Sequence, residues 1–288
     1  MKMQTHITGK RTAILAMFLF PLVAAGCSTN PATGKKHFIF ISQEQEIAIG
    51  AEAAPEFEKE FGGKVPNQEL QAYVRMVGGK ASAVSERKMP YEFTLVQSKV
   101  PNAFALPGGK IFITAGLMSK MTNERQLAAV LGHETGHVAA QHNVLGMQKQ
   151  MGIAVLADIA GKIAGEEKAE SAQAAAKVVA GMASLKYSRD DEYEADELGI
   201  RYMTGAGYNP WGMVELLTVL QNLSESESGS LTEMFRTHPL TSKRIAEARD
   251  IIEDKHKGFS PSTADPNAAR FLQMRSLLLN TVSGLTEK

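Results

Sequence analysis

Hydrophobic residues recur every three or four positions through most of this chain, which is the spacing of helices that bury one face. Ser42 with Gln45 three residues later resembles a capping box and predicts a helix that runs to residues 62–63. Asn67 is the expected cap of the next helix, whose apolar stripe is Leu70, Tyr73, Val74 and Val77. Further helices are predicted over residues 123–147 and 187–203, and after residues 209, 242 and 265.

A shorter part of the chain alternates between polar and apolar residues, as strands do. Residues 91–97 follow this period after Pro90, and residues 102–106 and 110–114 flank a Pro-Gly-Gly turn. Two such runs on either side of a tight turn predict a β-hairpin. The whole pattern therefore predicts an α+β fold that is mainly helical and carries a small sheet.

Residues 148–186 are rich in Ala and Gly and have a helical period. Asp158, Lys162 and Glu167 interrupt the apolar run, so we do not expect it to cross a membrane. We expect a packed or cleft-covering helical pair here, and a role at a membrane surface is the alternative.

Composition narrows the possible functions. The chain has 288 residues, of which 44% are hydrophobic, and this is enough for one large domain with its own core. Lys and Arg together number 31 and so do Asp and Glu, so the sequence carries no electrostatic sign of nucleic-acid binding.

The N-terminus reads as an export signal of the lipoprotein type. Residues 1–26 begin with positive charges, continue with a short apolar run and end in small residues before Cys27. This end resembles the lipobox of bacterial lipoproteins, in which the Cys carries a lipid. Cys27 is the only Cys of the chain and has no partner for an internal disulfide. An ordinary signal peptide with an incidental Cys is the alternative.

The predicted organisation is therefore a signal peptide over residues 1–26, a lipidated N-terminus and tether over 27–41, a catalytic domain over 42–255 and a helical tail over 256–288. In bacteria with two membranes, a Ser after the lipidated Cys, here Ser28, resembles an address to the outer membrane.

The strongest chemical signal is the HETGH motif at residues 133–137. His133 and His137 stand four residues apart, about 40° around a helix, so both imidazoles leave the same face. This spacing suits two nitrogen ligands of one zinc ion, and Glu134 beside them is in the position of a general base. The alternative is two surface histidines and a solvated Glu.

Other polar residues fit this site less directly. Glu192 and Asp196 share a helical face, like a ligand and a supporting carboxylate, although an exposed acidic helix is the commoner meaning of such a run. His142 lies about 140° from His137 on a continuous helix, so we interpret it as a surface or packing residue.

Four segments carry a resemblance to a known family: HETGH at 133–137, EYEAD at 192–196, NAFALPGG at 102–109 and THPLTSKR at 237–244. They resemble metallopeptidase family 48, the gluzincins of the HtpX, BepA and LoiP type that are related to CAAX prenyl proteases. The resemblance implies a zincin-like domain that binds one zinc ion per chain. It assigns His133, His137 and Glu192 as zinc ligands and Glu134 as the base.

The same resemblance implies supporting roles. Asp196 would orient His133, and Arg244 would be a structural or electrostatic partner nearby. His238 would lie close to the metal, where it would either stabilise the oxyanion or occupy the open coordination site in a latent form; a histidine of a structural turn is the alternative. The strand formed by Asn102, Ala103, Phe104 and Ala105 would bind substrate by adding it as a further strand.

The expected function is that of a zinc metalloendopeptidase for unfolded or misfolded proteins of the bacterial envelope, anchored by lipid and facing the periplasm. Prenylated substrates are not expected, because the mature chain lacks the transmembrane helices of the integral-membrane relatives. Partner binding through tetratricopeptide repeats is not expected either. Two alternatives remain: an assembly factor that holds outer-membrane proteins and rarely cleaves them, and a metal-storing lipoprotein. The sequence leaves the oligomeric state open.

Overall fold

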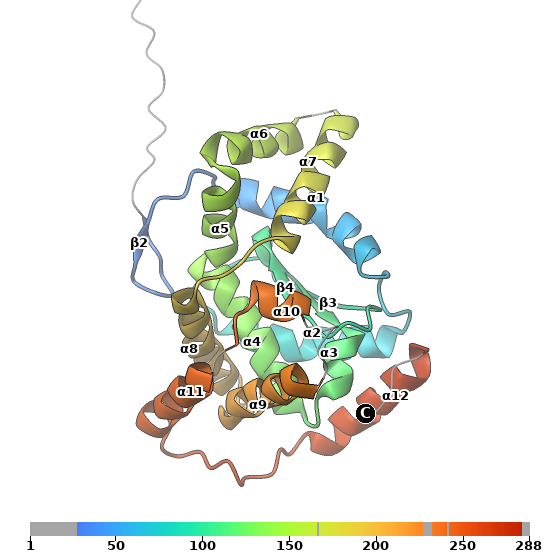
Figure 1. Cartoon of the computed structure of the whole chain (residues 1–288), viewed down its shortest axis with the longest axis vertical. Coiled ribbons are helices and arrows are strands. Elements are labelled where there is room, and N and C mark those ends of the chain that lie inside the picture. The colour runs from blue at the N-terminus through green and yellow to red at the C-terminus, as the bar shows by residue number, and fades with distance from the viewer. Residues whose placement is uncertain (1–27, 166, 227–231, 241, 284–288) are drawn as a thin grey trace, which may run out of the picture.

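The structure is a computed structural model, and it describes residues 28–283 except 166, 227–231 and 241. The predicted signal peptide and Cys27 lie outside the described residues. The part that is described confirms a mainly helical α+β fold with one small mixed sheet at its centre (Figure 1).

The central sheet has the strand order β3-β5-β4. The outer strand β3 (Glu92–Val96) runs parallel to β5 (Lys110–Thr114), and β4 (Ala103–Leu106) runs antiparallel to it. The predicted hairpin is confirmed, since β4 and β5 are joined by the turn η1 (Pro107–Gly109), in which Gly108 and Gly109 adopt φ values of 74° and 83°. Glycine adopts such values without strain. A second, minimal sheet pairs β1 (Ser28–Thr29) with β2 (Lys36–His37).

The described helices surround this sheet. They are α1 (Gln43–Glu60), α2 (Gln68–Ala83), α3 (Ala115–Lys120), α4 (Glu124–Ala140), α5 (His142–Met151), α6 (Ile153–Ala164), α7 (Lys168–Ala183), α8 (Arg189–Gly205), α9 (Trp211–Ser226), α10 (Thr232–Thr237), α11 (Ser242–Lys255) and α12 (Ala268–Thr281). Helix α4 is buried along its whole length and packs against the sheet on one side and α8 and α9 on the other. Helices α1, α6 and α7 lie at one end of the molecule, and α9, α11 and α12 at the other (Figure 1).

The predicted caps of the first helices are confirmed. Ser42 and Gln45 form a reciprocal capping box at the start of α1, and the Asn67 side chain accepts a hydrogen bond from the Leu70 backbone. At the start of α4, the Gln126 backbone donates to the Asn123 side chain at 3.0 Å. These local bonds satisfy backbone N–H groups that a helix leaves free at its start.

Two helix boundaries differ from the prediction. The helix expected over residues 123–147 is two helices, because Gln141 adopts a left-handed conformation with φ 65° and ψ 23° and ends α4. A non-glycine residue rarely does so, and no Gly or Pro marks this break. The helix expected from residue 187 begins at Arg189, because Ser188 and Asp191 form a capping box there. Tyr187 consequently belongs to the loop before α8.

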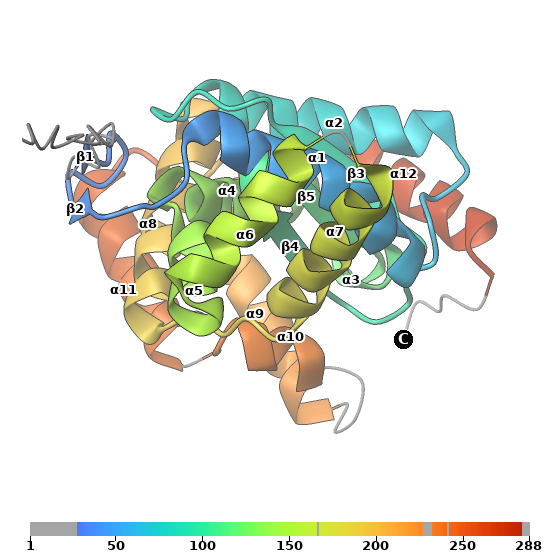
Figure 2. The same ribbon diagram turned by 90° about the horizontal axis from the view of Figure 1, so that it is seen from above.

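The predicted helical pair of residues 148–186 is present as α6 and α7, which pack on each other and on α1 (Figure 2). Their apolar faces join one core cluster with α1 and an aromatic group made of Phe57, Phe61, Phe104 and Phe112. In the described part of the chain, no helix combines the length and the apolar character needed to span a membrane.

Residues 30–36, expected as a tether, are instead docked on the domain. Asn30 is buried and its side-chain Nδ2 donates to the Ala139 carbonyl at 2.8 Å, near the end of α4. Its Oδ1 accepts from the backbone N–H groups of Ala32 and Thr33. The segment is therefore fastened to the helix that carries the HETGH motif.

Candidate metal centre

Helix α4 carries the HETGH motif and α8 carries the EYEAD motif. Close packing of these two helices brings the motifs together. Glycines stand where the helices cross: Gly132 and Gly136 on α4, and Gly199 on α8. A Cβ atom at Gly136 would lie 2.9 Å from the Ala195 carbonyl oxygen, and one at Gly199 would lie 2.9 Å from the His133 backbone nitrogen. Only glycine permits this approach, so the backbones are near enough for short side chains on α8 to reach α4.

Four buried side chains converge at this crossing. His133, His137, Glu192 and His238 each direct a possible ligand atom into one cluster, and these atoms lie within 4.8 Å of one another. The Nε2 atoms of His133 and His137 are 3.0 Å apart, and Glu192 Oε1 lies 3.4 Å from His137 Nε2. Two nitrogens bound tetrahedrally to zinc at 2.0–2.1 Å would be separated by about 3.3 Å. The donor set therefore fits a zinc ion with small adjustments.

The electrostatics of the cluster also suit a cation. Burial lowers the pKa of His137 well below its usual value, which leaves the neutral imidazole that binds metal ions. Burial by itself would raise the pKa of Glu192, but Arg244 and His238 outweigh it and hold that pKa well below the usual range. Glu192 is thus a buried carboxylate.

Glu134 lies beside the cluster and is almost fully buried. Its Oε2 has no hydrogen-bond partner among the described residues, and its Oε1 is 3.9 Å from His238 Nε2. Burial raises the pKa of Glu134, and the nearby His238 and His133 limit that rise. A carboxylate with a raised pKa and a free oxygen is suited to accept a proton from a water molecule.

Asp196 and Arg244 support the cluster from behind. Asp196 Oδ1 lies 2.9 Å from His133 Nδ1, although the ring N–H is not aligned for a hydrogen bond. Arg244 binds both oxygens of Asp196 at 2.7 Å and Glu192 Oε2 at 2.5 Å. Burial by itself would raise the pKa of Asp196. The nearby Arg244, helped by His133, outweighs this effect, so the pKa is lowered. A single guanidinium therefore holds Glu192 and Asp196, two of the carboxylates of α8, in fixed positions.

His238 enters the cluster from the loop between α10 and α11. Its backbone N–H donates to the Met234 carbonyl at 2.8 Å, and its Nδ1 lies 3.0 Å from Glu192 Oε1. Glu192 and Glu134 raise the pKa of His238 against the opposing effect of burial. The His238 ring thus contacts Glu192 through Nδ1 and lies near Glu134 on its Nε2 side.

Two residues at this site were missed or misjudged from the sequence. Tyr187 stacks on the His137 ring at 4.0 Å between centroids, and nothing in the local pattern marks it. His142 is buried, which confirms a packing residue and not a surface one, but its Nδ1 lies only 3.0 Å from His137 Nδ1, so the predicted separation of about 140° from His137 is wrong. The cause is the left-handed turn at Gln141, which redirects α5 and cancels the rotation expected on one continuous helix. The spacing HxxxH-x₄-H was the available signal.

The edge strand β4 borders the same centre. Phe104 and Ala105 line a small pocket together with Met182, Leu185, Tyr187, Thr237 and His238. Asn102, at the start of the strand, accepts a hydrogen bond from Ala103 N, and its Nδ2 has no partner among the residues described. Because β4 is the last strand of the sheet, one edge of it is not paired with any other strand of the described residues.

Glu134 itself lines a second pocket, most of whose lining residues are apolar. It is lined by Val130, His133, Glu134, Met213, Leu216, Leu217, Leu220, Met234, His238, Leu240 and Arg244. The cluster thus borders both the edge strand β4 and a mainly apolar pocket, an arrangement that suits an extended chain with one apolar side chain inserted.

Comparison with known proteins agrees with this geometry. The model of Peptidase family M48 matches residues 64–252. The chain is 27% identical over 240 residues to a β-barrel assembly-enhancing protease of Escherichia coli K12, covering 80% of this chain and 48% of the relative. It is 33% identical over 165 residues to the metalloprotease LoiP of the same strain, covering 56% of this chain and 62% of LoiP.

The chain is also similar to the mitochondrial metalloendopeptidase OMA1 of Schizosaccharomyces pombe. The two are 28% identical over 236 residues, which cover 78% of this chain and 66% of OMA1. The chain spans about half the length of the β-barrel assembly-enhancing proteases that it matches. Since the family model covers more than half of the chain and a buried His/Glu cluster lies within the matched region, this protein belongs to peptidase family M48, a family of metallopeptidases.

Proposed function

We propose that this protein is a zinc-dependent endopeptidase in which His133, His137 and Glu192 bind one zinc ion and Glu134 is the general base. The observation that carries the proposal is the buried cluster of ligand atoms beside a carboxylate whose outer oxygen has no partner among the described residues. When bound, zinc would supply Lewis-acid activation of the scissile carbonyl and of a water molecule.

The chain's own residues would perform the remaining steps. An extended substrate adds to the free edge of β4 through main-chain hydrogen bonds, and one of its side chains enters the apolar pocket next to Glu134. Glu134 takes a proton from the attacking water and delivers it to the departing amine. His238 lies where it can donate a hydrogen bond to the oxyanion. Asp196 and Arg244 keep the ligand side chains in position.

The proposed setting is the bacterial cell envelope, with Cys27 lipidated and the domain facing the periplasm at the outer membrane. Support comes from the lipobox-like sequence before Cys27, and from the name of the β-barrel assembly-enhancing protease to which the chain is similar. We propose misfolded or unfolded envelope proteins as substrates, because binding through main-chain hydrogen bonds depends little on sequence. Membrane fractionation tests the anchor: Cys27→Ser should release the protein into the soluble fraction, whereas equal membrane retention would contradict it.

The second candidate, a largely latent protease that holds unfolded outer-membrane proteins, is favoured by one observation. His238 Nδ1 lies 3.0 Å from Glu192 inside the cluster, where it can compete with substrate. Casein degradation by the zinc-loaded wild type and by His238→Ala separates the possibilities. A latent protease gains activity in the variant, and a protease assisted by His238 loses it. A pure holdase cleaves in neither form, and that result would contradict the endopeptidase proposal.

A further inference from the structure

His142, the first residue of α5, lies directly behind His137. The two Nδ1 atoms are 3.0 Å apart and the rings are nearly perpendicular, at 71°. The Nε2 atom of His137 faces His133 Nε2 in the ligand cluster, so Nδ1 is the nitrogen that is left for a contact outside it. His142 is itself only 4% exposed, and its ring therefore has few possible orientations.

The contacts of His142 define which ring nitrogens carry hydrogen. A neutral His137 that binds a metal ion through Nε2 carries its hydrogen on Nδ1. His142 Nδ1 must then accept this hydrogen bond, and the hydrogen of His142 resides on Nε2. That nitrogen lies 3.1 Å from Glu194 Oε2, a carboxylate that can only accept. Every donor in this series consequently meets an acceptor.

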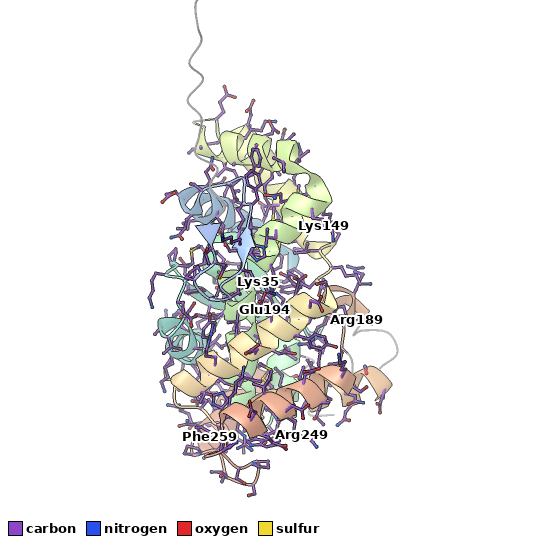
Figure 3. All side chains as sticks on the ribbon, turned by 90° about the vertical axis from the view of Figure 1, so that its left-hand side faces the viewer. Lys35, Lys149, Arg189, Glu194, Arg249 and Phe259 are labelled. Carbon is purple, nitrogen blue, oxygen red and sulfur yellow. The ribbon has the colours of Figure 1, made fainter. Side chains whose placement is uncertain are left out.

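Glu194 connects this series of hydrogen bonds, from His137 through His142, to the docked N-terminal segment of residues 30–35. Its second oxygen lies 2.8 Å from Lys35 Nζ, and Figure 3 shows the two labelled side chains close to each other on one face of the molecule. Lys35 follows the turn that Asn30 fastens to the Ala139 carbonyl and to the Gln141 side chain, at 2.8 and 3.1 Å. Gln141 is the left-handed residue that directs His142 toward His137.

We propose that His142 and Glu194 are positioning residues for His137, and that the docked segment of residues 30–35 helps to hold them. In metal sites, the group that receives the second N–H of a ligating histidine fixes the orientation and the tautomer of the ring. Here a second histidine has that role, and a carboxylate clamped by Lys35 fixes this second histidine in turn. The segment that would follow the lipidated Cys27 is thereby coupled to the metal centre.

Zinc affinity is the direct test, measured on the purified mature chain by competition between zinc and a chromogenic chelator at neutral pH. We expect His142→Leu and Glu194→Ala to raise the zinc Kd by about 10- to 100-fold. Glu194→Gln retains an oxygen acceptor for His142 Nε2–H and should restore most of the affinity. Lys35 is 54% exposed, so Lys35→Met should raise Kd by no more than about 5-fold.

Glu197→Ala is the matched control. Glu197 lies on the same helix and pairs with Lys255 at 2.6 Å, and both side chains are about half exposed. Its substitution removes a carboxylate of α8 without touching His142, and the zinc Kd should stay within about 2-fold of the wild type. After treatment with a chelator at neutral pH, Glu194→Ala and Glu194→Gln should have similar unfolding midpoints, because both lose the carboxylate charge. A difference in zinc Kd between these two variants therefore separates positioning from a general loss of stability.

The inference rests on the proposed role of His137 as a zinc ligand, and the outcomes distinguish the two. A wild type that binds no zinc would overturn both. A wild type that binds zinc while Glu194→Ala and His142→Leu bind it equally well would overturn the positioning role alone. Equal weakening by Glu194→Ala and Glu197→Ala would also overturn it, because surface charge would then be the cause.

Discussion

Gly199→Ala should disturb the close crossing of helices α4 and α8. The added Cβ would lie 2.9 Å from the His133 backbone nitrogen, 3.1 Å from the His133 Cα and 2.8 Å from Met213 Cε. The Met213 methyl group can move away, but the backbone of α4 cannot do so without shifting the helix. The substitution should therefore separate the two helices by a few tenths of an ångström.

The expected magnitude has two opposing parts. Replacing a helical glycine by alanine favours the helix by about 1 kcal/mol. Overpacking a tight contact costs about 1–3 kcal/mol. Gly161 supplies the control for the first part, because a Cβ on this residue of α6 meets nothing within 4 Å. The free energy of unfolding of Gly199→Ala should thus lie about 1–3 kcal/mol below that of Gly161→Ala.

Two assays test this reasoning. Thermal unfolding should place the midpoint of Gly199→Ala roughly 2–12 °C below that of Gly161→Ala for a protein of this size. The zinc Kd should rise about 10-fold in Gly199→Ala, because Glu192 and Asp196 move with α8 away from the histidines of α4. Equal midpoints together with an unchanged zinc Kd would refute the close packing of these helices.

Three further predictions concern the charges around the site and the metal. In denaturant unfolding, Arg244→Met should destabilise the zinc-free protein by about 3–5 kcal/mol, since Glu192 and Asp196 stay buried without a cation. The control Arg249→Met, on the exposed face of α11 (Figure 3), should be near neutral. Burial alone would raise the pKa of Glu194, but hydrogen bonds from His142 and Lys35 lower it from 4.5 to about 2. Its stabilising contribution is therefore complete above pH 4.5 and lost as the pH falls toward 2, so the difference in melting temperature between wild type and Glu194→Gln should shrink over that range; a constant difference would contradict this. Removing the metal with a chelator should lower the stability by about 4 kcal/mol relative to protein in zinc at 1,000 times its Kd, and zinc should restore both melting temperature and activity.

Local sequence signals predicted most of the elements. The capping boxes, the apolar stripes and the Pro-Gly-Gly turn act over a few residues, and α1, α2, α9 and the β4–β5 hairpin follow them. Likewise, the i, i+4 spacing of His133 and His137 is a property of one helix, and the structure brings their Nε2 atoms together.

Local sequence patterns did not predict the contacts between segments that are distant in the chain. The side chain of the left-handed Gln141 accepts a hydrogen bond from Asn30, which is 111 residues away in the chain, and nothing around residue 141 marks the break. The position of His142 follows from that turn. Tyr187 stacks on His137 from the loop before α8, where its backbone N–H donates to the carbonyl of the distant Thr237. Residues 30–36 have a tether-like composition, yet the side chain of one Asn docks them.

The proposed role of Glu134 is tested most directly by hydrolysis of casein by the purified, zinc-loaded wild type and Glu134→Gln, with zinc content measured on the same samples. The account predicts that the variant retains about one zinc ion per chain, because Glu134 is not among the proposed ligands. Its cleavage rate should fall by about 10²- to 10⁴-fold, the usual contribution of a general base. A variant that carries zinc and cleaves at the wild-type rate would contradict the account.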